Sequence, residues 1–193
     1  MRDVPPCKLL LAITGATGML FVRSFLTELQ QLDIIVHGIC SSSGRKVLKM
    51  EQQIIPEQLP VVSHWFQEDD FTAAPASGSS HYDAMVVLPC TMGTLGAIAG
   101  GLSINLIHRA ADVMLKERRR LVLAVRETPF NRTHLQNMLT VHDAGGVICP
   151  PMPGFYMNPG TLEEAAQLYS WRLADQLGLD IPQRKRWGDP TTC

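Results

Sequence analysis

Short apolar runs alternate with helical patterns along most of this chain, and this alternation restricts its fold more than any other feature. Residues 8–13 form a continuous apolar run that ends at a glycine turn. Such a run is typical of a strand that is covered on both faces of a parallel sheet. Comparable runs, each expected to be a strand, follow at 34–40, 84–88, 121–125 and 147–149.

Apolar residues recur at helical spacing between these runs and after the last one. They predict helices over 20–29, 45–53, 94–99, 106–117, 134–142 and 162–176. Gly178 is expected to end the last helix. The prolines and glycine of 55–80 predict an irregular segment with a short strand near Val61 and Val62. Together these elements predict one three-layer α/β domain, Rossmann-like (flavodoxin-like) and doubly wound, with a mostly parallel sheet.

The length and composition agree with a single domain. The chain has 193 residues, of which 46% are hydrophobic, enough for a sizeable core. We assign 1–181 to the domain and 182–193 to a polar C-terminal tail. The formal charge of −1 gives no general attraction to nucleic acid or to an anionic membrane. Small molecules and proteins are therefore the expected partners, and the apolar stretch 9–13 is too short for a signal peptide or a membrane span.

Five cysteines are widely spaced, and neither a CxxC pair nor a zinc-type Cys/His grouping is present in the sequence. This pattern predicts a reducing compartment, the cytoplasm, and no metal site. Cys40, Cys90 and Cys149 each end a strand-like run, where a small buried hydrophobe is the expected role. The alternative for Cys90 is a nucleophile.

Polar segments follow four of the predicted strands, where open α/β sheets bind their ligands. In the first of them, Gly15-Ala16-Thr17-Gly18, glycine permits a tight bend, Thr17 offers a hydroxyl, and helix-start amides suit a phosphate. Serines 41–43 follow the second strand, where a dinucleotide site would need an acidic residue. A mononucleotide is therefore favoured over NAD.

The other two polar segments are 90–94 and 126–129. Thr91 and Thr94 place hydroxyls at a helix start, where a simple N-cap is the alternative to ligand binding. Arg126 and Glu127 are expected either to pair with each other or to serve a charged substrate. Arg109 and Lys116 lie seven residues apart, roughly on one helix face, so both could reach one anion.

With these motifs, the chain resembles the flavin prenyltransferase family of the UbiX type over nearly its full length. The resemblance rests on Ile-Thr-Gly-Ala-Thr-Gly at 13–18, Pro-Cys-Thr-Met-Gly-Thr-Leu at 89–95 and Arg-Glu-Thr-Pro at 126–129. It extends to the segments 109–119, 134–139, 153–156 and 186–188. It implies transfer of a dimethylallyl group from dimethylallyl monophosphate to reduced FMN, giving prenylated FMN for a partner decarboxylase.

The resemblance also implies where each group binds. A homo-oligomer built from trimers, up to a dodecamer, would hold the flavin at a subunit interface. The flavin residues would be Gly15, Ala16, Thr17, Ser41, Thr91, Met92, Gly93, Thr94 and Arg126. The prenyl phosphate would be held by Lys116, Glu127, Tyr156 and Arg172, with Arg109 nearby. Glu51 would handle a proton, Thr17 would lie near the reactive flavin nitrogen, and Trp187 would form an aromatic wall as the tail closes the site.

Some positions differ from the usual family pattern. Threonine stands at 17 and 91, where serine is commoner, and Met19 and Val22 are larger than the usual residues beside the ligand turn. These differences favour one alternative, a non-catalytic FMN carrier or regulatory subunit. A second alternative is a flavin-dependent decarboxylase of peptidyl cysteine, whose substrate loop the segment 75–80 partly matches.

Overall fold

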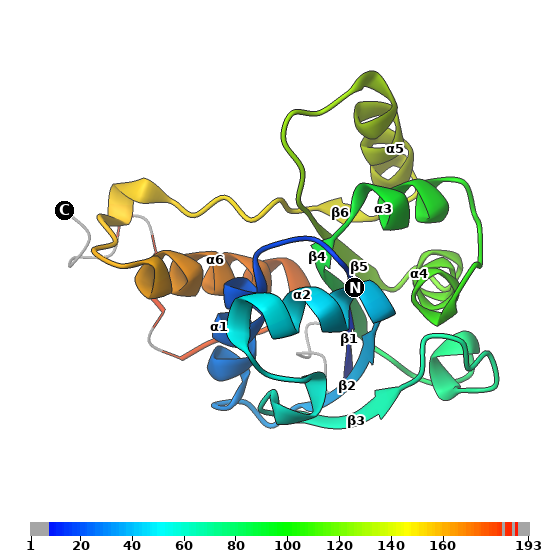
Figure 1. Ribbon diagram of the computed structural model, residues 1–193, viewed down its shortest axis with the longest axis horizontal. Coiled ribbons are helices and arrows are strands. Elements are labelled where there is room, and N and C mark those ends of the chain that lie inside the picture. Colours follow the sequence, from blue (N-terminus) through cyan, green and yellow to red (C-terminus); the bar gives the residue numbers. More distant parts are fainter. Residues whose placement is uncertain (1–7, 183, 187, 189–193) are drawn as a thin grey trace.

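A six-stranded parallel sheet forms the centre of the molecule in a computed structural model that describes residues 8–182, 184–186 and 188. The strand order is β3-β2-β1-β4-β5-β6, and all five neighbouring pairs are parallel. This is the doubly wound Rossmann order, and without the edge strand β3 the remaining five strands follow the flavodoxin-like order. The predicted fold class is confirmed, and the sheet is wholly parallel (Figure 1).

The strands and helices alternate as the sequence predicts. The strands are β1 Lys8–Ile13, β2 Ile35–Cys40, β3 Val62–Phe66, β4 Ala84–Cys90, β5 Arg120–Val125 and β6 Val147–Ile148. The helices are α1 Met19–Leu29, α2 Ser42–Gln52, α3 Met92–Ala99, α4 Leu106–Lys116, α5 Arg132–Asp143 and α6 Leu162–Leu177. Short 3-10 turns are η1 Pro56–Gln58, η2 Ala74–Ala76 and η3 Phe155–Met157.

Three helix starts differ from the prediction by two residues or more. α5 begins at Arg132, two residues before the predicted start, because the Asn131 side chain accepts from the amide of His134. α2 begins at Ser42, three residues before the predicted start, because the Ser41 side chain accepts from the amide of Gly44. α3 begins at Met92, two residues early, because Thr91 caps it in the same way. In all three helices a capping side-chain oxygen, rather than the apolar pattern, decides where the helix starts.

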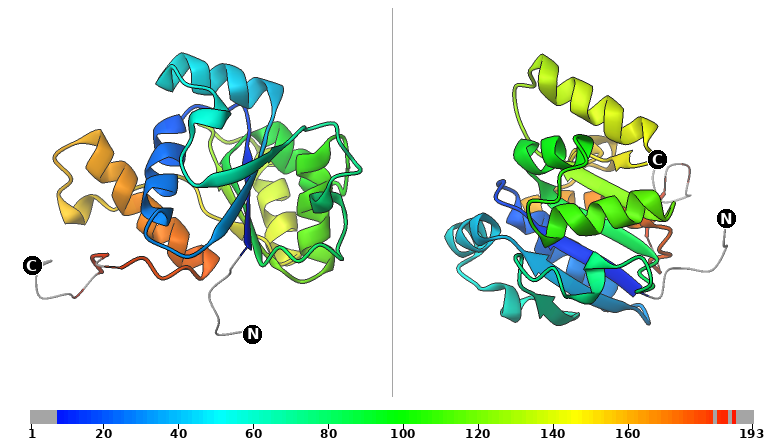
Figure 2. Two further views of the ribbon diagram at one scale, coloured as in Figure 1. Left: turned by 90° about the horizontal axis from the view of Figure 1, so that it is seen from below. Right: turned by 90° about the vertical axis from the view of Figure 1, so that its right-hand side faces the viewer.

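The central strands are buried on both faces, so their side chains enter two separate cores. Leu9 and Leu11 of β1 belong to the core beneath α1, α2 and α6. Leu10 and Ala12 point the other way, into the core beneath α3, α4 and α5. Figure 2 shows these two helical layers on opposite faces of the sheet. This arrangement explains why the strands are apolar without alternation.

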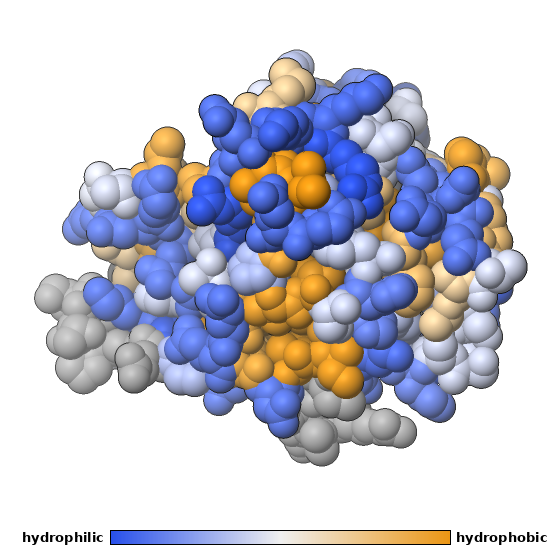
Figure 3. Space-filling model, turned by 60° about the horizontal axis from the view of Figure 1, so that its bottom comes forward, coloured by the Kyte–Doolittle hydropathy of each residue, from blue (hydrophilic) through white to orange (hydrophobic). Residues whose placement is uncertain are grey.

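One apolar surface region lies at the edge of the sheet that β3 forms. Figure 3 shows apolar side chains gathered around the β2–β3 edge. The partly buried residues that pack against the core beneath α1, α2 and α6 include Leu32, Ile34, Ile54, Val61 and Val62. In the described residues, no helix has both the length and the apolarity that a membrane crossing requires.

Candidate active site

Strands are added on one side of β1 in the first half of the chain and on its other side, beginning with β4, in the second half. Thr14, directly after β1, links the carboxyl ends of β1 and β4 by hydrogen bonds. Its hydroxyl donates to the carbonyl of Pro89 at 2.7 Å and accepts from the amide of Thr91 at 2.9 Å. Thr14 is 3% exposed, so water cannot replace these bonds. Because open α/β sheets bind ligands at this switch point, Thr14 fixes the frame of the expected crevice.

The glycine turn after β1 packs tightly against the start of α2. A Cβ on Gly15 would lie 2.5 Å from the Cβ of Ser43, and a Cβ on Gly44 would lie 2.7 Å from the carbonyl oxygen of Ile13. Glycine is therefore required at both positions by close approach of the backbone. Thr17 remains exposed at the tip of the turn, beside the strand ends.

Glu51 of α2 occupies the N-terminus of α1. Its carboxylate accepts from the amide of Gly18 at 3.0 Å and from the amide of Met19 at 2.8 Å. Sequence reasoning expected free amides here for a phosphate, but an internal carboxylate already bonds to them, in accord with the positive end of the helix dipole. Nothing local predicts this contact, since Glu51 lies 33 residues from Gly18.

The starts of α2 and α3 differ in whether a carboxylate accepts from their first amides. The amide of Ser42 donates to Glu68 at 2.7 Å, a carboxylate that sequence reasoning missed. At α3, Thr91 caps Thr94 at 3.2 Å, and no described side-chain carboxylate accepts from the first helical amides. A Cβ on Gly93 would meet nothing within 4 Å. The α3 start is therefore an approachable place for an anion.

Arg126 and Glu127 lie exposed at the end of β5, on the same edge as the glycine turn. The amide of Arg126 donates to the carbonyl of Cys90 at 3.0 Å, which ties this end to β4. Glu127 accepts from the amide of Thr128 at 2.9 Å, and none of the ion pairs between described residues joins it to Arg126. The ion pair between Arg126 and Glu127, one of the two roles expected for these residues, is not formed.

Lys116 does not reach this edge within one chain. Lys116 ends α4 and contacts Glu117 near the amino end of β5, whereas Arg126 follows its carboxyl end. At about 3.3 Å per residue, β5 separates them by about 20 Å. Arg109 donates to the carbonyl of Ala76 at 3.0 Å and pairs with Asp112 at 2.8 Å. The hydrogen bond from Lys116 is the main cause that lowers the pKa of Glu117.

Tyr156 and Arg172, the other predicted phosphate residues, line one cavity of about 520 Å³ next to α6. Three consecutive cationic residues of the C-terminal segment, 184–186, also line it. When the side-chain amide of Gln176 is oriented with its oxygen toward Arg172, this oxygen accepts from both terminal nitrogens of the guanidinium group, each at 3.2 Å. Trp187, the predicted aromatic wall, lies outside the described residues.

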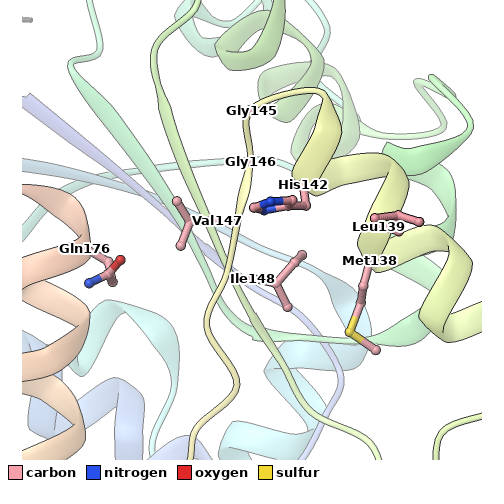
Figure 4. A pocket seen from close by; sticks show the side chains of 8 residues that line it. All are labelled: Met138, Leu139, His142, Gly145, Gly146, Val147, Ile148 and Gln176. Carbon is pink, nitrogen blue, oxygen red and sulfur yellow. The ribbon is translucent and has the colours of Figure 1, made fainter.

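A second cavity, of about 660 Å³, contains none of the predicted site residues. Figure 4 shows it between the C-terminal end of α5, the start of β6 and Gln176 of α6. Met138, Leu139 and Ile148 make its lining mostly apolar. Because Gly145 and Gly146 precede β6, this cavity lies at the amino end of the strand, away from the ligand edge.

Burial answers two questions that the sequence left open. Cys90 is 0% exposed and burial raises the pKa of its thiol, so it is a core residue and not an activated nucleophile. Burial also raises the pKa of Cys40, to about 12. Met19 and Val22 are 0% exposed and belong to the core beneath α1. Their bulk is therefore directed into the core, not into the ligand turn.

Known proteins resemble this chain over almost all of its length. The family model described as Flavoprotein matches residues 2–172. The flavin prenyltransferase UbiX of Methanocaldococcus jannaschii is 41% identical, over 94% of this chain and 98% of that protein. The solved structure of AnUbiX (PadA1) in complex with FMN and dimethylallyl pyrophosphate has a TM-score of 0.91 and 40% identity, covering 94% and 97%. A dodecameric FMN-dependent UbiX-like decarboxylase from Escherichia coli O157:H7 has a TM-score of 0.90 and 35% identity, covering 94% and 100%.

Proposed function

Since the chain belongs to the Flavoprotein family and, within it, to the UbiX flavin prenyltransferases, we propose that it transfers a dimethylallyl group from dimethylallyl monophosphate to reduced FMN. The product is prenylated FMN, the cofactor of a partner decarboxylase. The observation that carries this proposal is the 41% identity to a flavin prenyltransferase over 94% of the chain. The core positions of Met19 and Val22 remove two of the features that favoured an FMN carrier, and the buried Cys90 is unsuited to act as a nucleophile.

The carboxyl edge of the sheet has the donors that FMN needs. We assign the flavin to Gly15, Ala16, Thr17, Ser41, Thr91, Met92, Gly93, Thr94 and Arg126. The α3 start and the cation of Arg126 suit a phosphate, because helix-start amides and guanidinium groups both bind anions. Reduced FMN, when bound, supplies the electron pair for the new bond to the allylic carbon and gives up one proton.

The donor phosphate needs residues that one chain holds apart. Tyr156 and Arg172 share a cavity, Glu127 lies at the carboxyl end of β5, and Lys116 lies at its amino end. We propose that a homo-oligomer completes the site, so that Lys116 and Arg109 of one copy serve the flavin of another. The dodecameric relative supports such an assembly. Cations gathered on the departing phosphate lower the barrier, because they stabilise the charge that develops as the carbon–oxygen bond breaks.

We assign the remaining roles to four parts of the chain. Glu51, held beside the glycine turn, handles a proton, and Thr17 faces the reactive edge of the flavin. The tail 182–193 closes the site, with Trp187 as a ring face for the allylic cation. The described cysteines, Cys40, Cys90 and Cys149, are free thiols, which supports a reducing cytoplasmic location.

Anaerobic incubation with reduced FMN and dimethylallyl monophosphate, followed by mass analysis of the flavin, tests this function. A flavin heavier by one dimethylallyl group is expected. Tight FMN binding without any adduct would overturn the transferase proposal and leave a flavin carrier. Carbon dioxide release from a peptide with a C-terminal cysteine, without an adduct, would instead indicate a peptidyl-cysteine decarboxylase.

A further inference from the structure

A loop rich in serine lies against the ion pair at the end of α4, and the proposed function gives this loop no role. The serine loop, residues 77–80, precedes β4 and belongs to the segment that partly matches the substrate loop of peptidyl-cysteine decarboxylases. A Cβ on Gly78 would overlap the Oε1 atom of Glu117 and would lie 2.9 Å from the Nζ atom of Lys116. The backbone of the serine loop is therefore in direct contact with the Lys116–Glu117 pair.

Arg119, whose side chain is 18% exposed, ties the serine loop to the end of α4. Its terminal nitrogens donate to the carbonyl of Gly78 at 2.7 Å and to the carbonyl of Ser80 at 3.1 Å. The nitrogen that bonds to Gly78 also lies 3.9 Å from the Oε2 atom of Glu117. One guanidinium group thus joins the loop backbone to the carboxylate that holds Lys116, which requires the rigid fork of donors that arginine provides.

Other hydrogen bonds restrain the backbone of the serine loop and of the residue before it. The hydroxyl of Ser80 donates to the carbonyl of Ser77 at 2.9 Å. Arg109 of α4 donates from its Nε atom to the carbonyl of Ala76 at 3.0 Å. Because the backbone is held on both sides of Gly78, an atom added at this glycine displaces the flexible ends of the ion pair more easily than it displaces the loop.

We propose that the serine loop and Arg119 position Lys116 for the donor phosphate. Arg119 fixes the loop, the loop limits where the carboxylate of Glu117 can lie, and Glu117 directs the ammonium group of Lys116. An exposed ion pair by itself would give little fixation, since such pairs contribute little free energy. Arg119 and Gly78 are therefore positioning residues, which affect the reaction through Lys116. The inference rests on the proposed function for the role of Lys116.

Gly78→Ala tests the contact between the loop and the ion pair. Gly78 is not among the described glycines with a left-handed backbone, so alanine is compatible with its conformation. Prenyl transfer is expected to fall about tenfold or more, because a small displacement of a group that stabilises the departing phosphate is costly. FMN affinity should stay unchanged. Gly160→Ala is the matched control and should keep the parent activity, since its Cβ would lie 3.5 Å from Oε2 of Glu164, an ordinary contact.

A double-mutant cycle separates positioning from a general loss of structure. When Lys116→Met is already present, Gly78→Ala is expected to change the transfer rate by less than about twofold, because the side chain through which it acts is gone. Arg119→Gln should depend on Lys116 in the same way, and Arg119→Lys should keep part of the activity. An equal fall with and without Lys116 would refute the proposal. If Arg119→Gln does not fold, the cycle with Gly78→Ala decides.

Crystal structures of the unaltered protein, Gly78→Ala and Gly160→Ala separate this proposal from the proposed function. The ammonium of Lys116 is expected to move away from Glu117 in Gly78→Ala alone. An ammonium that stays in place would overturn the positioning role, even if the unaltered protein forms the prenyl adduct. If the unaltered protein forms no adduct although Gly78→Ala displaces the ammonium, the transferase function is refuted and the fixation of Lys116 by the serine loop stands.

Discussion

Carboxylates bond to two helix starts at the carboxyl end of the central sheet, whereas an arginine bonds to loop carbonyls at its amino end. At the carboxyl end, Glu51 accepts from the first amides of α1 and Glu68 accepts from the first amide of α2. At the amino end, Arg119 donates to the carbonyls of Gly78 and Ser80, at 2.7 and 3.1 Å. In a doubly wound fold the helices begin at the carboxyl end and finish at the amino end, so their dipoles favour this distribution.

This difference indicates what each end contributes to catalysis. The carboxyl end offers amides and hydroxyls to a flavin, but the internal acids occupy two of its helix starts and leave α3 open. The amino end carries the cation Lys116, which is out of reach of that edge in its own chain. Under the proposed function, we therefore expect the two ends of the site to be supplied by different copies.

The largest effect is expected from two variants, each of which removes one cation, Arg126 at the carboxyl end of the sheet or Lys116 at its amino end. Arg126→Met and Lys116→Met should each lower prenyl transfer about 10²- to 10³-fold, the usual cost of removing a group that stabilises developing charge. Co-expressed, the two variants should regain part of the activity, because some sites combine an intact Arg126 with an intact Lys116. Activity of the mixed oligomers, measured by adduct mass, checks this. Failure to regain activity would mean that both residues act from one copy.

Glu51→Gln tests the acid at the carboxyl end. FMN affinity should stay nearly unchanged, while maturation of the adduct should slow about 10²-fold or more, as expected when a proton-transfer group is lost. Glu57→Gln is the control, because it removes a carboxylate that pairs with Arg45 at 2.9 Å near the same helix. Fluorescence titration of FMN and the time course of adduct formation measure the two quantities. Equal maturation rates in Glu51→Gln and the parent would exclude a proton role.

Thr14→Val tests the hydrogen bonds that join β1 to β4. The change leaves the amide of Thr91 without its partner and removes one of two hydrogen bonds to the carbonyl of Pro89, which still accepts from the amide of Thr14 at 3.3 Å. The free energy of unfolding should therefore fall by about 1–3 kcal/mol. FMN binding should weaken as well, because the crevice loses its frame. Urea unfolding measures the stability change, and Thr14→Ser, which keeps the hydroxyl, should stay close to the parent.

The smallest effect is expected at the exposed amino end. The hydrogen bond from Lys116 lowers the folded-state pKa of Glu117, so the pair stabilises the protein above the ordinary glutamate pKa. That contribution is lost as the pH falls through the lowered pKa. Glu117→Gln should therefore lower Tm by about 1 °C or less near neutral pH, and salt should remove the difference. A larger shift that persists in high salt would contradict a surface ion pair.

The apolar pattern of the sequence predicts where the strands end, and with them the edge of the sheet at which we propose the site. The apolar pattern does not predict the helix starts at Ser42 and Met92, because a side-chain cap decides them rather than apolar periodicity. The hydrogen-bond partners of Glu51 and Glu68 could not be predicted from the sequence for another reason. These carboxylates reach amides of segments that only the folded chain brings near, 26 to 33 residues away.

The sequence by itself determined the alternation of strands and helices and the resemblance that points to a flavin. It did so because apolar periodicity and short motifs are local properties of the chain. Only the tertiary structure decided which amides are already bonded, that Met19 and Cys90 lie in the cores, and that Lys116 is far from Arg126. The physical reason is that burial, charge pairing and distance across a sheet depend on packing between segments remote in sequence.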